Sequence, residues 1–418
     1  MTVRQPHLLC IGGEDHYLRI PFLLLLLSRG FQVSAAGTGD PAPFLQAGLA
    51  YHRFHCGRFV SPMADWTTLK ALSKIIADVR PAIVQCFDTK LNVLVPFAAR
   101  ARTDVMVVST INGLGWLYSS QSPTALALRP IYQALQRLAS DATAVMVFQN
   151  RDDLTFFARN RMCVSERSML IPGSGIDIAA FERAASNKSS PQQLRMALGV
   201  GNAEVVMTVT RMTRQKGIPT LLEAAGLVHQ QRPGVRFVLV GPRESEGRFA
   251  VTQAEIDRHS PYVIAVGARS DVPALLAIAD VFVFPSEYFE GIPRVLLEAA
   301  VAERPIVTTN MPGCSDIVRD GWNGYLVPPR APRILADRII DLLCDRKTAK
   351  VMGTRASQRV RNEFNLEVTV ARYAAVYEDL LSRSAGKRFP KSGQAADEQA
   401  SGPATAVPMS DSRRVAES

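Results

Sequence analysis

The chain alternates short apolar runs with longer segments of helical periodicity, and it completes this alternation twice in succession. Such alternation is typical of parallel β-strands that are joined by crossover helices. The expected strands of the first half are 8–12, 31–36, 82–86, 105–110 and 144–148, and those of the second half are 205–209, 236–240, 263–266, 281–284 and 305–308. The sequence therefore predicts an α/β protein with two doubly wound parallel sheets in tandem, which face each other across a cleft.

Changes in composition indicate where these two domains begin and end. Residues 184–193 are rich in serine, alanine and asparagine, so they are predicted to link a first domain, 1–183, to a second domain, 194–365. The helical pattern over 366–383 lies past the end of the second domain, and we expect it to cross back to the first. Few large apolar residues occur over 384–418, and this tail is predicted to be disordered.

The charge of the chain narrows the classes of partner. The formal net charge is +10 over 418 residues, which favours phosphorylated small molecules, nucleic acids and anionic membrane surfaces. Basic residues are spread along the chain rather than interleaved with aromatic residues, and no zinc-finger, RNA-recognition or basic-zipper pattern occurs. Nucleic acid is therefore not an expected partner.

The cysteines, histidines and apolar runs bear on metal binding and on the compartment. The six cysteines form no C-x-x-C pair, and His52, His55 and Cys56 lack a further set of ligands, so no metal site is expected. The N-terminal segment does not show a cationic leader with a cleavage site, and the apolar run 20–27 is far shorter than the ~20 residues of a membrane span. These features predict a cytoplasmic protein in a reducing compartment.

A first candidate site follows the expected strand 281–284. The loop 285–293 leads into a helical pattern over 295–302, and free N–H groups at such a helix start bind phosphate. Glu290 lies before the helix and Glu298 lies on its second turn, so the two carboxylates are expected to hold separate points of one long ligand. The alternative is an ordinary strand–loop–helix unit with a solvated glutamate.

A second candidate site follows the expected strand 205–209. Arg211 and Lys216 lie between this strand and a helical pattern over 218–228. Two cations at the carboxyl end of a strand can neutralise a diphosphate as it takes up charge on leaving. The alternative is a solvated basic turn, which is the commoner situation of lysine and arginine.

The order of these motifs resembles the retaining glycosyltransferases of family 4. The resemblance lies in Glu290 and Glu298, which have seven residues between them, and in the ordered segments 171–177, 211–217, 267–271, 279–286, 305–307 and 320–327. Each motif is degenerate by itself, but the ordered set is specific, and the similarity covers most of residues 1–382. The chain departs from the family pattern at Pro312, where the family often has glycine, and at Asp316, where it usually has glutamate.

This resemblance implies the GT-B fold, in which two Rossmann-like domains face a cleft. It implies that Arg211 and Lys216 contact the donor diphosphate, that Glu290 holds the transferred sugar and that Glu298 binds the ribose. The residues implied in donor binding are Gly12, Gly13, Arg211, Lys216, Arg269, Glu290, Gly291, Ile292, Pro293 and Glu298. Of these, Arg211, Lys216 and Glu290 are implied to be catalytic.

A retaining reaction fits the types of residue in the chain. No Ser-His-Asp set or other general base is evident, and in a retaining transfer the departing phosphate oxygen can accept the proton of the acceptor hydroxyl. No Asp-x-Asp pair follows a strand of the second domain. We therefore expect no metal and no cofactor, with a nucleotide diphosphate sugar as the donor substrate.

The first domain is expected to select the acceptor through its loops 12–19, 87–90 and 112–118. The first and third of these loops resemble the subgroup of family 4 that extends sugars on polyprenyl diphosphates. The implied acceptor-binding residues are His16, Arg19, Lys90 and Asn112, which replaces a histidine of many family members. The apolar helix after Arg19 is interpreted either as lying against the inner face of the cell membrane or as a core helix with solvated flanks.

The function that these patterns predict is transfer of a hexose or N-acetylhexosamine to a sugar acceptor. The expected donor is a UDP-sugar, and the expected acceptor is a polyprenyl-diphosphate-linked glycan in surface polysaccharide or glycan biosynthesis. Two alternatives are a non-hydrolysing nucleotide-sugar 2-epimerase on the same scaffold and a catalytically inert subunit that binds a sugar nucleotide.

Overall fold

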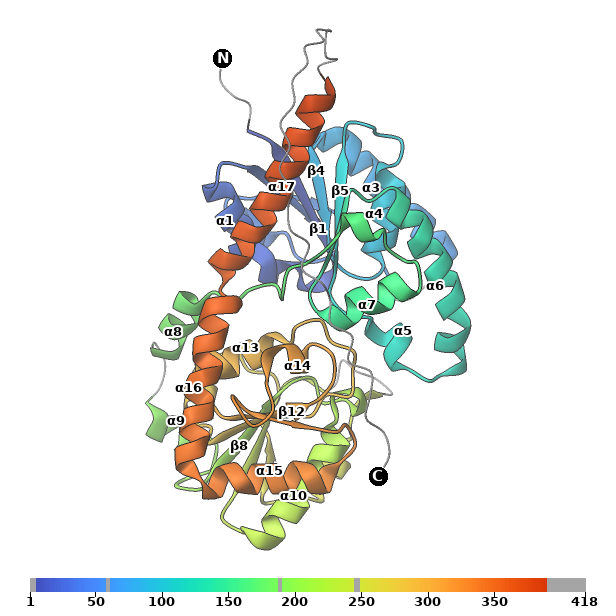
Figure 1. Cartoon of the computed structure of the whole chain (residues 1–418). Helices are drawn as coiled ribbons and strands as arrows, with labels where there is room; N and C mark the ends of the chain where they lie inside the picture. The colour runs from blue at the N-terminus through green and yellow to red at the C-terminus, as the bar shows by residue number, and fades with distance from the viewer. Residues whose placement is uncertain (1–4, 58–60, 187–189, 244–248, 389–418) are drawn as a thin grey trace, which may run out of the picture.

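The computed structural model describes residues 5–57, 61–186, 190–243 and 249–388, and it shows two α/β domains placed end to end (Figure 1). The strands of the first domain are β1 (His7–Gly12), β2 (Gln32–Gly37), β3 (Ala50–Arg53), β4 (Ile83–Cys86), β5 (Met106–Ile111), β6 (Val145–Phe148) and β7 (Ser168–Leu170). The strands of the second domain are β8 (Val205–Val209), β9 (Arg236–Val240), β10 (Val263–Ala265), β11 (Val281–Phe284), β12 (Ile306–Thr309) and β13 (Tyr325–Val327). The expected strands are all present, and the short edge strands β3, β7 and β13 are additional.

The helices connect these strands and cover both faces of each sheet. Those of the first domain are α1 (Ile20–Ser28), α2 (Ala42–Gln46), α3 (Pro62–Val79), α4 (Leu91–Ala99), α5 (Gly115–Ser119), α6 (Pro123–Asp141) and α7 (Arg151–Arg159). The later helices are α8 (Ile178–Ser186), α9 (Pro191–Ala197), α10 (Ile218–Gln231), α11 (Gln253–Asp257), α12 (Val272–Ala277), α13 (Arg294–Val301), α14 (Cys314–Ile317), α15 (Pro332–Cys344), α16 (Arg346–Glu363) and α17 (Leu366–Arg388). Short 3-10 turns occur at η1 (Glu14–Arg19), η2 (Ser165–Arg167) and η3 (Arg214–Lys216).

The strands are apolar because each sheet is buried on both faces. In β1, Leu8 and Cys10 pack into the core beneath α1 and α17, whereas Leu9 and Ile11 pack into the core beneath α3 and α4. Successive side chains of a strand point to opposite faces, so a strand between two helical layers is apolar at every position. This arrangement explains why the strands could be predicted from continuous apolar runs.

Both sheets are parallel and share one topology. The described residues form sheets in the orders β3-β2-β1-β4-β5-β6-β7 and β10-β9-β8-β11-β12-β13. The chain order reverses between β1 and β4 in the first sheet and between β8 and β11 in the second. Ligands of such folds bind outside the carboxyl ends of the strands at this switch point. The loops that follow β1, β4, β8 and β11 are therefore the places to look for a site.

The boundary between the domains differs from the predicted linker at 184–193. Ile171 packs into the core of the first domain, whereas Ile176, Ile178 and Phe181 already belong to the core of the second. The chain thus passes between the domains at 172–175, and the first domain ends before the predicted residue 183. The serine-rich stretch instead separates two short surface helices, α8 and α9, whose few apolar residues face the second core.

The last helix returns to the first domain, as the sequence led us to expect. Helix α17 runs along α1, and its Tyr373 and Tyr377 are buried in the core of the first domain (Figure 1). The Tyr377 hydroxyl donates a hydrogen bond of 2.8 Å to Gln85, and the Tyr373 hydroxyl lies 3.1 Å from the Thr110 hydroxyl oxygen. The helix extends to Arg388, beyond the expected end at residue 383, so 384–388 of the predicted disordered tail are helical. The rest of that predicted tail, 389–418, lies outside the described residues.

Candidate active site

Lys216 and Glu290 meet at the switch point of the second sheet. Lys216 ends η3 after β8, and Glu290 lies in the loop after β11; their side chains form an ion pair through Lys216 Nζ and Glu290 Oε1. The Ser286 hydroxyl donates a 2.9 Å hydrogen bond to the same carboxylate oxygen. Both side chains are largely enclosed, at 11% and 14% exposure. The structure thus joins the two candidate sites of the sequence into one.

Local backbone geometry brings these two loops into contact. The Thr213 hydroxyl accepts a 3.3 Å hydrogen bond from the Lys216 N–H and so closes the turn that carries the lysine. A side chain at Gly217 would collide with the carbonyl oxygen of Pro285, so only glycine lets the β8 loop lie directly on the β11 loop. The glycine that follows Lys216 in the sequence is therefore required for the ion pair.

Aromatic rings surround the ammonium group of the ion pair. Lys216 Nζ lies 5.1 Å from the centre of the Tyr288 ring and 5.7 Å from that of Phe284, within the range of cation–π attraction. The nearby Cys314 is buried, and burial raises the pKa of its thiol to about 12, so it stays protonated and is a poor nucleophile. The site offers charge and hydrogen bonds rather than a covalent nucleophile.

Three glycines bring the two domains into backbone contact beside Glu290. A Cβ atom on Gly113, which has a φ of 104°, would lie 2.7 Å from the amide nitrogen of Gly291. A Cβ atom on Gly291 would lie 2.8 Å from the carbonyl carbon of Asn112, and one on Gly313 would collide with the Gly291 carbonyl oxygen. The loops after β5, β11 and β12 therefore touch without side chains between them, and the backbone at Gly291 is confined from both domains.

Glu298 lies on α13, the helix that follows the Glu290 loop. Its carboxylate accepts a 3.0 Å hydrogen bond from Arg294, and burial raises the pKa of Glu298 above its ordinary value. Pro293 is the N-cap of α13, since the helix begins at Arg294. The Ile292 side chain packs partly against the second core, where a Cβ atom on Gly173 would approach it to 3.3 Å.

The other two cations implied in donor binding lie on loops of the second domain. Arg211 directly follows β8 and is half-buried, and its carbonyl oxygen accepts a 2.8 Å hydrogen bond from the Thr213 N–H. Arg269 is exposed and donates hydrogen bonds of 2.8 and 2.6 Å to Asp271. The structure thus gives Arg269 a carboxylate partner within its own loop.

The switch point of the first sheet holds Gly12, Gly13 and His16. The Gly13 N–H donates a 2.7 Å hydrogen bond to Asp88, which ties the loop after β1 to the loop after β4. A side chain at Gly12 would collide with the ring of His16. His16 is buried against Phe44, and burial together with the charge of Arg19 lowers its pKa to about 3, so it remains neutral.

The three remaining acceptor candidates occupy different surroundings. The Arg19 guanidinium stacks 4.1 Å from the centre of the Phe87 ring. Lys90 forms an ion pair with Asp65 and donates a 2.8 Å hydrogen bond to the Gly57 carbonyl. Asn112 lies at the glycine contact between the domains, and within the described part of the chain its buried Oδ1 has no hydrogen-bond partner. Of these candidates, the structure brings Asn112 closest to the backbone of the Glu290 loop.

Asp153, which the sequence did not single out, is expected to make stability pH-dependent. Burial raises the pKa of its carboxyl from 3.8 to about 7, and the charges of Asp152 and Asp316 add to this. The folded protein then keeps a proton that the unfolded chain releases above pH 3.8. The free energy of unfolding should therefore fall as pH rises through this window, by about 1.4 kcal/mol per pH unit.

Replacing Asp153 with asparagine should remove this slope. Urea unfolding of Asp153→Asn at several pH values between the two pKa values measures it, and Asp78→Asn, at an exposed position on α3, is the control. A slope in Asp153→Asn equal to that of the wild type would contradict the prediction.

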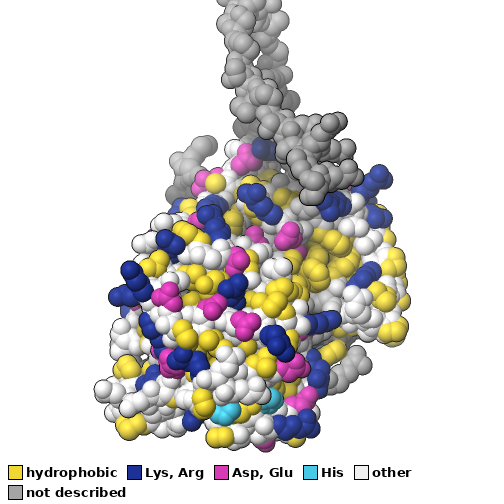
Figure 2. Space-filling view, turned by 60° about the horizontal axis from the view of Figure 1, so that its bottom comes forward, with side chains coloured by type: hydrophobic (Ala, Val, Ile, Leu, Met, Phe, Trp, Pro, Cys, Tyr) yellow, Lys and Arg dark blue, Asp and Glu magenta, His cyan; other side chains and the backbone are white. Residues whose placement is uncertain are grey.

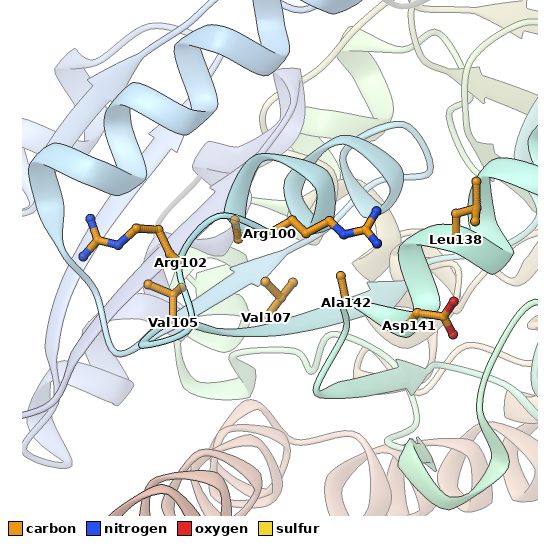
Figure 3. A pocket seen from close by; sticks show the side chains of 8 residues that line it. Arg100, Arg102, Val105, Val107, Leu138, Asp141 and Ala142 are labelled. Atoms are coloured by element: carbon orange, nitrogen blue, oxygen red, sulfur yellow. The ribbon is translucent and has the colours of Figure 1, made fainter. Parts of the chain in front are cut away.

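One hollow of the described surface lies away from this site. It has a volume of about 260 Å³ and opens at the amino end of β5, between Arg100, Arg102, Val107 and Leu138 (Figure 3). Ligands of parallel α/β sheets bind at the carboxyl ends, so this hollow is not the active site. The face of the second domain that Figure 2 brings forward carries basic and acidic side chains in mixture rather than one basic patch.

The fold and the site together define a class of protein. Two parallel-sheet domains meet through the loops at their switch points, and an enclosed Lys216–Glu290 pair lies where they meet. This is the architecture of a GT-B glycosyltransferase, an enzyme that transfers a sugar to an acceptor.

Two glycosyl transferase sequence models match the chain, one in each domain. The sequence model described as "Glycosyl transferases group 1" matches residues 192–359, and that described as "Glycosyl transferase 4-like" matches residues 7–150. The predictions of a GT-B fold and of a glycosyltransferase are thereby confirmed. Among the described residues, no helix is long and apolar enough to cross a membrane.

Characterised relatives are similar over most of the chain. It is 24% identical to the N,N'-diacetylbacillosaminyl-diphospho-undecaprenol alpha-1,3-N-acetylgalactosaminyltransferase of Campylobacter jejuni, over 88% of this chain and 97% of the relative. It is also 24% identical to the UDP-Gal:alpha-D-GlcNAc-diphosphoundecaprenol alpha-1,3-galactosyltransferase of Escherichia coli, over 78% of this chain and 82% of the relative. The crystal structure of Anabaena HepE in complex with UDP and glucose has a TM-score of 0.73 at 20% identity, over 90% of this chain and 100% of HepE.

Proposed function

We propose that this enzyme transfers a hexose or N-acetylhexosamine, with retention of configuration, from a UDP-sugar to a sugar on a polyprenyl diphosphate. The proposed setting is surface polysaccharide or glycan biosynthesis. The observation that carries the proposal is the enclosed Lys216–Glu290 pair, which lies at the second switch point in contact with a loop of the acceptor domain. Support comes from the two relatives, whose names specify diphosphoundecaprenol-linked acceptors and alpha-1,3 linkages.

The donor fits this geometry in an extended arrangement. Lys216 and Arg211 supply positive charge for the diphosphate, and Glu290 with the N–H groups of Gly291 and Ile292 holds the transferred sugar. Glu298 binds the ribose, and the hydrogen bond from Arg294 holds its carboxylate in place. The preformed loops of this site hold the reacting groups in place, which is the main contribution to catalysis when no nucleophile is used.

In the reaction, the acceptor hydroxyl attacks the anomeric carbon on the face that the diphosphate leaves. The bond from the anomeric carbon to the phosphate oxygen breaks, the new glycosidic bond forms, and the departing phosphate oxygen takes the hydroxyl proton. Lys216 stabilises the charge that develops on the leaving group. Retention then follows from attack on the same face.

The acceptor is proposed to approach through the first domain, from the cytoplasmic side of a membrane. Tyr17, Leu18, Leu24 and Leu27 are exposed on η1 and α1 next to Arg19, whereas Leu23 and Leu26 are buried. This exposed apolar side of α1 suits peripheral contact with the inner face of the cell membrane, where a polyprenyl-linked sugar resides.

Transfer is expected to need no divalent metal. Lys216 and Arg211 provide the positive charge that a metal ion would otherwise supply to the diphosphate, so activity should persist after treatment with EDTA. The measurement is the transfer rate before and after chelation, with a mock-dialysed sample as control. Complete loss of activity on chelation, restored by magnesium, would contradict the role given to the two cations.

Thermal shift with UDP-, GDP- and ADP-sugars tests the donor, because a ligand that binds only the folded state raises the melting temperature. We expect a UDP-sugar to raise the melting temperature. We also expect the enzyme to transfer the sugar of that donor to a synthetic polyprenyl-diphosphate-linked sugar.

NMR of the nucleotide sugar incubated without acceptor tests for an epimerase, which would convert the nucleotide sugar by itself. Glu290→Ala with undiminished glycan output in cells would instead support a catalytically inert subunit.

A further inference from the structure

Asn150, in the first domain, reaches across to the loop that carries Glu290 in the second. It follows β6 and is the N-cap of α7. Its Nδ2 atom donates a 3.2 Å hydrogen bond to the main-chain carbonyl oxygen of Glu290. Asn150 is fully buried, so this bond between the domains is shielded from water.

The Asn150 side chain is held in one orientation by its own helix. Its Oδ1 atom accepts a 2.7 Å hydrogen bond from the Asp153 N–H, and its Nδ2 atom donates a 2.8 Å hydrogen bond to Oδ2 of the Asp153 carboxyl group. The accepting bond fixes which end of the amide is oxygen, so the nitrogen must face Glu290. Asp153 is also fully buried, and it therefore acts as a fixed support for the amide.

Glu290 is thus held by the two domains at different atoms. Its carboxylate is bound within the second domain by Lys216 and Ser286, whereas its carbonyl oxygen is bound by Asn150 of the first. The following residue, Gly291, is confined by the glycine contact between the domains. Any separation of the domains breaks the bond to the carbonyl and leaves the bonds to the carboxylate intact.

We propose that Asn150 is a positioning residue that makes the placement of Glu290 depend on contact between the two domains. The inference rests on the proposed function, in which Glu290 holds the transferred sugar. Donor binding by the second domain needs only the bonds to the carboxylate. The transfer step needs the Glu290 loop in its final position. The hydrogen bond from Asn150 fixes the loop there once the first domain is in contact with the second.

The test separates this role from a structural one by comparing substitutions at the two ends of α7. Serine is as good an N-cap as asparagine, so Asn150→Ser keeps α7 capped. The serine side chain is too short, however, to reach the Glu290 carbonyl. The matched control is Asn160→Ser at the C-cap of the same helix, where the Asn160 amide donates 2.8 Å to Phe156 within the first domain. Both variants are assayed as full-length enzyme with a UDP-sugar and a polyprenyl-diphosphate-linked acceptor.

We expect Asn150→Ser to lower kcat by about 10- to 100-fold, the cost of a misplaced reacting group, with donor KM close to wild type. The melting temperature should fall modestly, because Asp153 also loses its donor, while the protein stays folded at the assay temperature. Asn160→Ser should keep wild-type kcat. A wild-type kcat in Asn150→Ser, or a loss of kcat matched by an equal loss of folded protein, would overturn the inference.

Glu290→Gln, assayed alongside, distinguishes the two levels of the proposal. If Glu290→Gln is inactive while Asn150→Ser is fully active, the positioning role fails and the proposed function stands. If Glu290→Gln is fully active, the proposed function fails and the positioning role fails with it.

Discussion

Glutamine in place of Glu290 is expected to lower kcat for sugar transfer by about 10³-fold, the size of effect seen when one preorganised group of a site is removed. The substitution keeps the shape of the side chain but removes the charge that pairs with Lys216 and accepts from Ser286. In the proposed reaction the carboxylate holds the sugar of the donor while the ammonium faces its diphosphate, so these two parts of the donor lose their alignment. The measurement is the initial rate at saturating UDP-sugar and lipid-linked acceptor.

Two further variants strengthen this prediction. Because Lys216 and Glu290 act as a unit, the double variant Lys216→Ala with Glu290→Gln should lose less than the product of the two single losses. The control is the exposed ion pair between Arg338 and Asp341 on α15, where Arg338→Ala should change kcat by less than about twofold. A Glu290→Gln enzyme with wild-type kcat would refute the assignment.

The second large effect is expected from a chain that ends at Asn365. This truncation removes α17, whose Val370, Tyr373 and Tyr377 are buried in the core of the first domain. Loss of one large buried side chain costs about 2–5 kcal/mol, and a domain has about 5–15 kcal/mol in total, so the first domain should not fold stably. Urea unfolding of the truncated and full-length chains, followed by near-ultraviolet circular dichroism, measures the loss.

Removal of one hydroxyl group is a smaller perturbation of the contact between α17 and the first domain. Tyr377→Phe keeps the ring but leaves the buried Gln85 oxygen without its donor, which should lower the free energy of unfolding by about 1–3 kcal/mol. Glu378→Ala, at the exposed neighbouring position, should leave it unchanged. A truncated chain with a cooperative transition for the first domain would show that α17 is dispensable. A Tyr377→Phe protein as stable as wild type would show that the bond to Gln85 does not contribute to stability.

Local sequence patterns predict most of the fold because its strands are buried on both faces. Continuous apolar runs such as 281–284 therefore coincide with strands, as β11 shows. The serine-rich stretch 184–193 led to a wrong prediction of the domain boundary. Composition indicates that a segment is exposed, but it does not indicate which core the few apolar residues of the segment join. Ile178 and Phe181 settle that question only through their packing.

The site was predictable where it depends on position relative to a strand. Lys216 and Glu290 each follow a strand of the second sheet, and two adjacent parallel strands bring such loops together. Asn150 and Gly313 were not found, because their roles arise from contacts with a loop far away in the sequence. The spacing of Asn150 and Asp153 is a recognisable helix-start signal, but such a signal does not reveal that the capping amide also reaches the other domain.

The return of α17 has a consequence for how the protein is made. The first domain leaves the ribosome first, yet part of its core, including Tyr373 and Tyr377, is synthesised after the entire second domain. Domains commonly fold in turn as they emerge during translation. Until α17 is synthesised, the apolar surface of β1 and α1 that α17 covers stays exposed in the nascent first domain. The newly made chain therefore depends on protection from aggregation until its last helix is complete.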